Sequence, residues 1–220
     1  TYTLSFPDAG IYWYHPHVRD DYAIEMGLYG NMWVTPKAGS SWNPVDREVP
    51  LFIDDILLLN GALAPFRKDG ADRTLMGRYG NTMFVNGETD YALAVKRGEV
   101  IRFYFTNSAN VRPFNLAIAG AKMKLVGGDS GLYERDRWSD AVLVNPSERA
   151  IIEVLFDTAG EYALQNKTPE VTYTLGTITV SNEQTVSAAE KSFATLRGLQ
   201  INILRIPSHK EFLQSILDFE

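Results

Sequence analysis

The chain has 220 residues, of which 45% are hydrophobic, and 21 lysines and arginines against 27 aspartates and glutamates give a formal net charge of −6. This composition supports a folded core and excludes an intrinsically disordered chain, and its acidity argues against a nucleic-acid-binding protein, which normally carries a basic surface. No apolar run approaches the roughly 18 residues of a membrane-spanning helix, and the absence of cysteine excludes disulfides, iron–sulfur clusters and thiolate metal sites within this chain.

The first 40 residues predict an incomplete domain. They hold enough apolar sequence for one pair of strands, with one or two helical turns between Asp20 and Gly27. A unit of this size rarely folds without a partner. Because the sequence opens at Thr1 with residues typical of the middle of a strand, we expect residues 1–40 to be the C-terminal part of a larger first domain.

Residues 49–182 predict one complete β-sandwich. Short runs with apolar residues at every second position alternate with turn residues throughout this stretch. In the run 100–106, for example, one face carries isoleucine and two phenylalanines, whereas the other carries Arg102, Tyr104 and Thr106. Many short strands of this kind favour an antiparallel sandwich, in which each strand has one face in the core and one in water.

Linkers are predicted on both sides of this sandwich. Residues 41–48 lie in a stretch rich in proline, glycine and serine. Residues 183–220 lose the two-residue alternation, and we interpret them as a linker followed by an amphipathic helix. That helix is predicted from a capping box at Ser208 and from an apolar stripe with helical spacing, formed by Phe212, Leu213, Ile216 and Leu217.

The segment with the clearest chemistry is the pair His15 and His17. Residues at i and i+2 of a strand point to the same side, about 6.6 Å apart along the backbone, so two imidazoles can converge on one metal ion or bind two neighbouring ions. Pro16 between them cannot donate to a sheet, which predicts a strand end. Two exposed histidines without a metal are the alternative, and His209 in the tail is expected to be one more exposed histidine. A usual metal site needs three or four ligands, so the others would come from elsewhere.

The surroundings of this pair resemble the second copper-ligand segment of the multicopper oxidases, the laccase-like enzymes. That segment reads Gly-Thr-aromatic-aromatic-Tyr-His-x-His, followed by a short helix, Gly-Leu-x-Gly and an apolar strand, and here Ile11 replaces the threonine. Further segments resemble the family's middle cupredoxin domain, namely residues 49–55, 85–87, 97–103, 127–131 and 144–150. Within them, Ser130 and Ser147 stand where the family has glycines.

The resemblance implies an all-β, cupredoxin-like Greek-key β-sandwich, preceded by part of a first cupredoxin domain and followed by a helical tail. It implies that His15 and His17 each bind one copper of the type 3 pair in a trinuclear cluster. In the family this cluster reduces dioxygen to water with electrons taken one at a time from a small reducing substrate. It also implies a periplasmic or extracellular location, which the sequence itself does not show.

The chain contains one of the family's four copper-ligand segments, so we expect the isolated chain to be inactive as an oxidase. A catalytically inactive cupredoxin scaffold or oligomerisation module is the alternative, as is a cluster completed by histidines across a symmetric oligomer. Strands missing from the first domain would leave apolar residues uncovered. We therefore expect self-association that covers Trp13, Leu28, Met32 and Val34.

Overall fold

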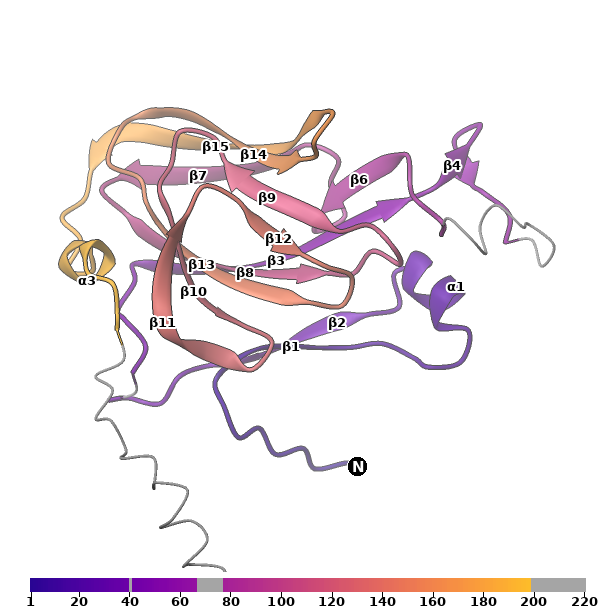
Figure 1. The fold of residues 1–220 in the computed structure, drawn as a ribbon, viewed down its shortest axis with the longest axis horizontal. Coiled ribbons are helices and arrows are strands. Elements are labelled where there is room, and N and C mark those ends of the chain that lie inside the picture. The colour runs from indigo at the N-terminus through magenta and orange to yellow at the C-terminus, as the bar shows by residue number, and fades with distance from the viewer. Residues whose placement is uncertain (40, 67–76, 199–220) are drawn as a thin grey trace, which may run out of the picture.

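The apolar faces of the predicted strands meet between two β-sheets, with short helices at the ends (Figure 1). The structure, a computed structural model, describes residues 1–39, 41–66 and 77–198. One sheet contains, in spatial order, β11 (Gly131–Ser139), β10 (Met123–Gly128), β13 (Arg149–Leu155), β8 (Val100–Asn107), β3 (Arg47–Ile56) and β6 (Thr82–Val85). The other contains β12 (Val142–Val144), β9 (Phe114–Ile118), β14 (Gly160–Lys167), β15 (Thr172–Gln184) and β7 (Tyr91–Arg97).

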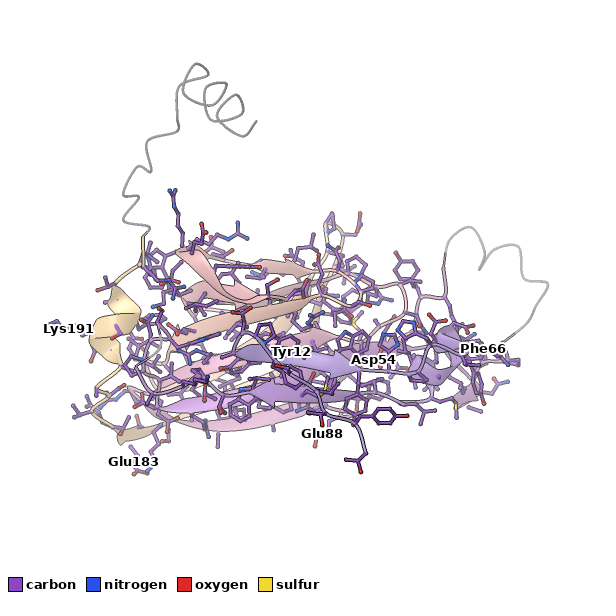
Figure 2. All side chains as sticks on the ribbon, turned by 90° about the horizontal axis from the view of Figure 1, so that it is seen from below. Tyr12, Asp54, Phe66, Glu88, Glu183 and Lys191 are labelled. Carbon is purple, nitrogen blue, oxygen red and sulfur yellow. The ribbon has the colours of Figure 1, made fainter. Side chains whose placement is uncertain are left out.

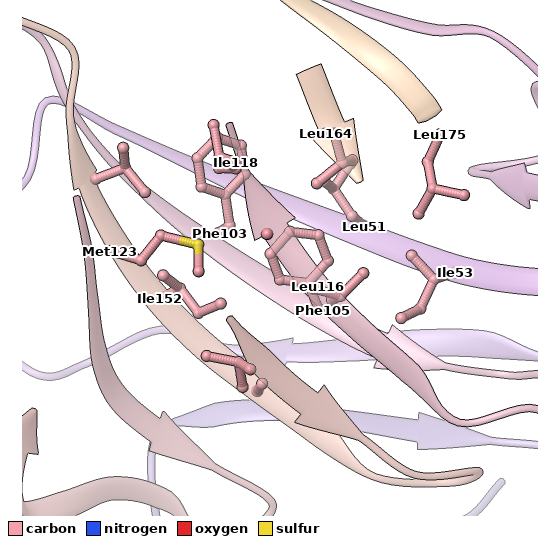
Figure 3. Packing of buried hydrophobic residues seen from close by; sticks show 14 of the residues in the cluster. Leu51, Ile53, Phe103, Phe105, Leu116, Ile118, Met123, Ile152, Leu164 and Leu175 are labelled. Atoms are coloured by element: carbon pink, nitrogen blue, oxygen red, sulfur yellow. The ribbon is translucent and has the colours of Figure 1, made fainter. Parts of the chain in front are cut away.

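The predicted all-β sandwich is confirmed, with one refinement to its pairing. Most neighbouring strands are antiparallel, but β3 pairs with β8 and β15 pairs with β7 in parallel. The core between the sheets contains the apolar residues that the alternation predicts, among them Ile101, Phe103 and Phe105 on β8. Figure 3 shows Phe103 and Phe105 packed near Leu116 and Ile118 of the opposite sheet.

The prediction that the second face of β8 is solvated is wrong. All eight residues of β8 are buried, because the N-terminal residues, the segment 41–46 and the end of helix α3 (Glu190–Ala194) cover the outside of this sheet. Arg102 is 2% exposed and its side chain lies over the ring of Trp42. Period-two patterning cannot reveal this cover, since the covering segments are distant in sequence.

A hairpin of β1 (Gly10–Tyr14) and β2 (Gly30–Val34), joined through helix α1 (Asp20–Glu25), lies against this outer face (Figure 1). Ile11 is fully buried there with Tyr104, Val126 and Ile151. A second small hairpin is formed by β4 (Leu58–Leu59) and β5 (Ala62–Leu63). The helix predicted between Asp20 and Gly27 is confirmed, and Arg19 occupies its N-cap position.

The start of β1 meets the turn between β10 and β11 at close range. Gly131 has φ +87°, and a Cβ there would collide with the carbonyl oxygen of Ala9. Gly131→Ala should lower the free energy of unfolding by about 2 kcal/mol, through left-handed strain and lost docking. Gly87→Ala is the control, because φ is +83° but no atom lies near the added methyl. Urea unfolding measures the stability of both variants, and hydrogen exchange measures the protection of the β1 amides. Equal losses of stability in the two variants would contradict the close contact.

The remaining segment boundaries differ slightly from the predictions. β3 begins at Arg47, two residues before the predicted start of the sandwich, and β15 ends at Gln184. The tail helix predicted from Ser208 lies outside the described residues. Among the described helices, none has the length and apolar character needed to cross a membrane.

Candidate functional site

His15 and His17 lie immediately after the end of β1. The last pair of the hairpin joins Tyr14 to Gly30, and the ring of Tyr14 occupies the space that a side chain at position 30 would need. The glycine therefore lets the strand end close to its partner. Pro16 then lies beyond the strand, as predicted, and leaves both histidines outside the sheet ladder.

The two imidazole rings lie side by side, with centroids 4.7 Å apart and an angle of 36° between their planes. His15 is half-buried and its Nδ1 lies 3.2 Å from the carbonyl oxygen of Pro16, whereas His17 is exposed. The ring of His15 also packs on Trp13, 4.4 Å away between centroids. The structure thus brings the two predicted residues together.

Neutral imidazole nitrogens suit copper, and also zinc, iron and nickel. In the part of the chain that the structure describes, however, no group of three or more His, Cys, Asp or Glu side chains could hold a metal ion. The pair therefore fits part of a copper ligand shell and needs further ligands from outside the described residues. His209, the remaining histidine, lies among the residues that the structure does not describe.

A buried carboxylate, Asp54, is connected to the imidazole pair through Tyr29 and Trp13. The Tyr29 hydroxyl donates to Asp54 Oδ2 over 2.7 Å, and the Asp54 side chain also accepts the backbone N–H of Asp55. Asp54, labelled in Figure 2, is buried. Its exposed fraction is 7%. Burial raises its pKa to about 6, against the lowering effect of the hydrogen bond from Tyr29. Burial and the nearby Asp54 charge also raise the pKa of the Tyr29 hydroxyl well above its ordinary value.

Two further buried carboxylates lie close by and are paired. Asp55 accepts a hydrogen bond from Arg112 over 2.6 Å, and burial outweighs this guanidinium, so the pKa of Asp55 is raised. Glu25 of α1 pairs with Arg78 over 3.0 Å and accepts from Asn110. The two contacts of Glu25 join helix α1 to the sandwich.

Sequence analysis missed Asp54 and Tyr29 as parts of this region. The available signal is the pair Asp54 and Asp55 within the apolar run of β3, since acidic residues in such a run are rarely buried without a partner. Asp20 and Asp21, which are nearer to the histidines in sequence, are exposed at the start of α1.

Comparison with known proteins agrees with this architecture. Residues 53–189, more than half of the chain, match the model of the multicopper oxidase family. The multicopper oxidase mco of Staphylococcus aureus is 26% identical over 152 residues, 67% of this chain and 33% of its own length. The cell division protein FtsP of Proteus mirabilis is 30% identical over 177 residues, 76% of this chain and 34% of its own length.

Solved structures give the same result. The crystal structure of a multi-copper oxidase from Pseudomonas thermotolerans superposes with a TM-score of 0.68 and 26% identity, covering 80% of this chain and 42% of that one. The sandwich is therefore cupredoxin-like, and the chain spans about one third of the length of the curated relatives that it matches. With the family model matched over most of the sandwich, the chain belongs to the multicopper oxidase family.

Proposed function

We propose that this chain supplies the His15 and His17 ligands of a copper cluster in a multicopper oxidase. When bound, copper would supply the one-electron chemistry that couples oxidation of a small reducing substrate to reduction of dioxygen to water. The observation that carries the proposal is the pair of imidazoles, 4.7 Å apart and outside the sheet at the end of β1. Each would hold one copper of a type 3 pair, within a cluster completed by ligands from other segments.

The chain's own residues would orient these ligands. Packing against Trp13 limits the rotation of the His15 ring, and the hairpin fixes the backbone from which both histidines extend. The middle sandwich would act as a spacer that binds no copper itself. The periplasm or the cell exterior is the proposed location, in line with family habit.

Copper binding tests the proposal directly. The variant that combines His15→Ala with His17→Ala should no longer bind added Cu(II), because both imidazole ligands of the proposed site are removed. Calorimetry and electron paramagnetic resonance measure this binding. His209→Ala is the matched control and should bind as the unchanged chain does. Retained binding in the double variant, or loss in the control, would contradict the assignment.

Oxidase activity should need the missing ligand segments. We propose that the isolated chain binds copper weakly and does not turn over a phenolic dye, since two histidines leave the ligand shell incomplete. The protein encoded by the complete reading frame should retain copper through purification and consume dioxygen. Robust turnover by the 220-residue chain would overturn this proposal.

A scaffold without redox chemistry is the second candidate. It is favoured by the relative whose name is a cell division protein and by the apolar surface of the hairpin, where Tyr14, Leu28 and Trp33 are 57%, 59% and 40% exposed. Such a surface suits association with another segment or a second copy. A concentration-dependent dimer in sedimentation experiments, with no copper in the complete protein, would favour this candidate.

A further inference from the structure

A continuous series of aromatic contacts leads from the imidazole pair into the protein. The His17 ring packs on His15, and His15 packs on Trp13 at 4.4 Å between centroids. Trp13 in turn meets the edge of Tyr29 at 6.3 Å. Packing of Trp13 on His15 orients a ligand, but the contact of Trp13 with Tyr29 does not touch the imidazoles, so the series requires an explanation beyond ligand positioning.

The series ends on a proton acceptor. The Tyr29 hydroxyl donates over 2.7 Å to Asp54, which is almost completely buried. A phenol that loses an electron becomes a strong acid, and its oxidation is much easier when a base accepts the proton at hydrogen-bond distance. Tyrosine is therefore the residue of this series best prepared to hold an oxidising equivalent.

The charges around Asp54 keep it available as this base at neutral pH. Tyr29 of the hairpin faces it, Asp55 follows it on β3, and Glu25 of α1 lies near enough to disfavour a further negative charge. Arg112 forms its ion pair with Asp55 and not with Asp54. With a pKa of about 6, Asp54 is ionised at pH 7 and above. Among the described residues, it has no arginine or lysine partner that would prevent it from accepting a proton.

We propose that Trp13 and Tyr29 carry a one-electron oxidising equivalent inward from the imidazole pair, with Asp54 accepting the Tyr29 proton. Trp13 gives one electron to a one-electron oxidant at the imidazoles, which is an oxidised copper ion if the proposed function holds. Tyr29 then gives one electron to the Trp13 radical cation, while its O–H bond breaks and the proton passes to Asp54. The products are the reduced oxidant, a neutral Tyr29 phenoxyl radical, protonated Asp54 and restored Trp13.

The chain contains a matched control for this arrangement. Tyr104 also donates to a carboxylate, Glu48, over 2.6 Å, and its ring lies near Trp33 and Trp42. No ring contact among the described residues connects Tyr104 to the histidines. In the part of the chain that the structure describes, a tyrosine donates to a carboxylate at two places, Tyr29 and Tyr104, and ring contacts connect Tyr29 but not Tyr104 to the imidazoles.

A photochemical oxidant attached at the imidazoles tests the proposal without copper. A ruthenium bis-bipyridine complex is coordinated to exposed His17 in the His209→Gln background, and flash–quench generates Ru(III) at that position. We expect a tyrosyl radical in transient absorption and freeze-quench electron paramagnetic resonance. Tyr29→Phe should remove the tyrosyl signal and Trp13→Phe should slow its formation by about tenfold or more, whereas Tyr104→Phe should change neither.

A second measurement uses the labelled protein with Trp13, Tyr29 and Asp54 unchanged, so it does not depend on whether the variants fold. Formation of the radical in the labelled protein should slow in D₂O, and its yield should fall as the pH is lowered through about 6, where Asp54 becomes protonated. A tyrosyl signal retained in Tyr29→Phe, lost in Tyr104→Phe or insensitive to D₂O would overturn the proposal. Copper binding retained in the variant that combines His15→Ala with His17→Ala would instead refute only the proposed natural oxidant.

Discussion

Replacing Glu153 by glutamine should lower the free energy of unfolding by about 3–5 kcal/mol, because it leaves two buried cations without their shared carboxylate. Glu153 is 1% exposed. Its Oε1 accepts from Arg102 Nη2 over 2.7 Å, and its Oε2 lies 2.9 Å from the ammonium of Lys124 as an ion pair. Lys124 itself is fully buried and donates to the carbonyl of Ser192 in α3.

The size of this effect follows from a row of charges across four neighbouring strands. Lys124 of β10 pairs in register with Glu153 of β13, Glu153 with Arg102 of β8, and Arg102 with Glu48 of β3. The signs alternate along the row, so each buried charge has an opposite neighbour. Removing an inner member leaves unpaired charge in a region of low dielectric, where the loss is much larger than at a surface.

The matched control is Glu183→Gln. Glu183, at the edge of the molecule in Figure 2, also forms a cross-strand ion pair, with Lys96. Both side chains of this pair are exposed to solvent. Solvent-exposed pairs contribute little, so this variant should unfold at nearly the same urea concentration as the unchanged chain. Urea unfolding followed by tryptophan fluorescence measures both variants, and similar midpoints would show that the buried row is not held by its charges.

Asp54→Asn should become more stable relative to the unchanged chain as the pH rises, by about 2.4 kcal/mol between pH 4 and pH 8. The pKa of Asp54 is about 6 in the folded protein and 3.8 is the ordinary value. The folded state therefore binds a proton more tightly than the unfolded state. The stability that this group contributes is fully present below pH 3.8 and is lost as the pH rises through about 6.

Asparagine removes this dependence because it has no charge to desolvate, and its amide oxygen can still accept from Tyr29. The difference between the two unfolding free energies, measured in urea at several pH values, cancels the titration of the groups that do not interact with Asp54. Asp90→Asn is the control, since Asp90 is exposed, and its curve should run parallel to that of the unchanged chain. A pH-independent difference for Asp54→Asn would show that this carboxylate titrates normally.

The local elements of the sandwich were predictable from the sequence. Phe114, Leu116 and Ile118 alternate along a short run and are all buried on β9, because a strand places every second side chain on the same face. The helix before Gly27 was predictable for an equally local reason, since glycine there adopts φ +77° after the last turn. The His15 and His17 pair was also visible, because its spacing and Pro16 are properties of neighbouring residues.

The surroundings of the candidate site could not be predicted in the same way. Tyr29 and Asp54 are 25 residues apart and belong to different elements. Their contact depends on how the hairpin lies against the outer face of the sheet. An aspartate in an apolar run indicates an unusual position, but it does not identify the donor that faces it.

What the sequence alone determined is the set of strands, the all-β class and a histidine pair at a strand end, since each depends on side-chain alternation or turn chemistry among near neighbours. Only the tertiary structure decided which polar residues are buried. Arg102, Lys124 and Glu153 have the pattern of a solvated face, yet the cover provided by residues 41–46 and α3 places them in the interior. The physical reason is that burial is a property of the assembled layers, so the same charges stabilise the fold only where distant segments meet.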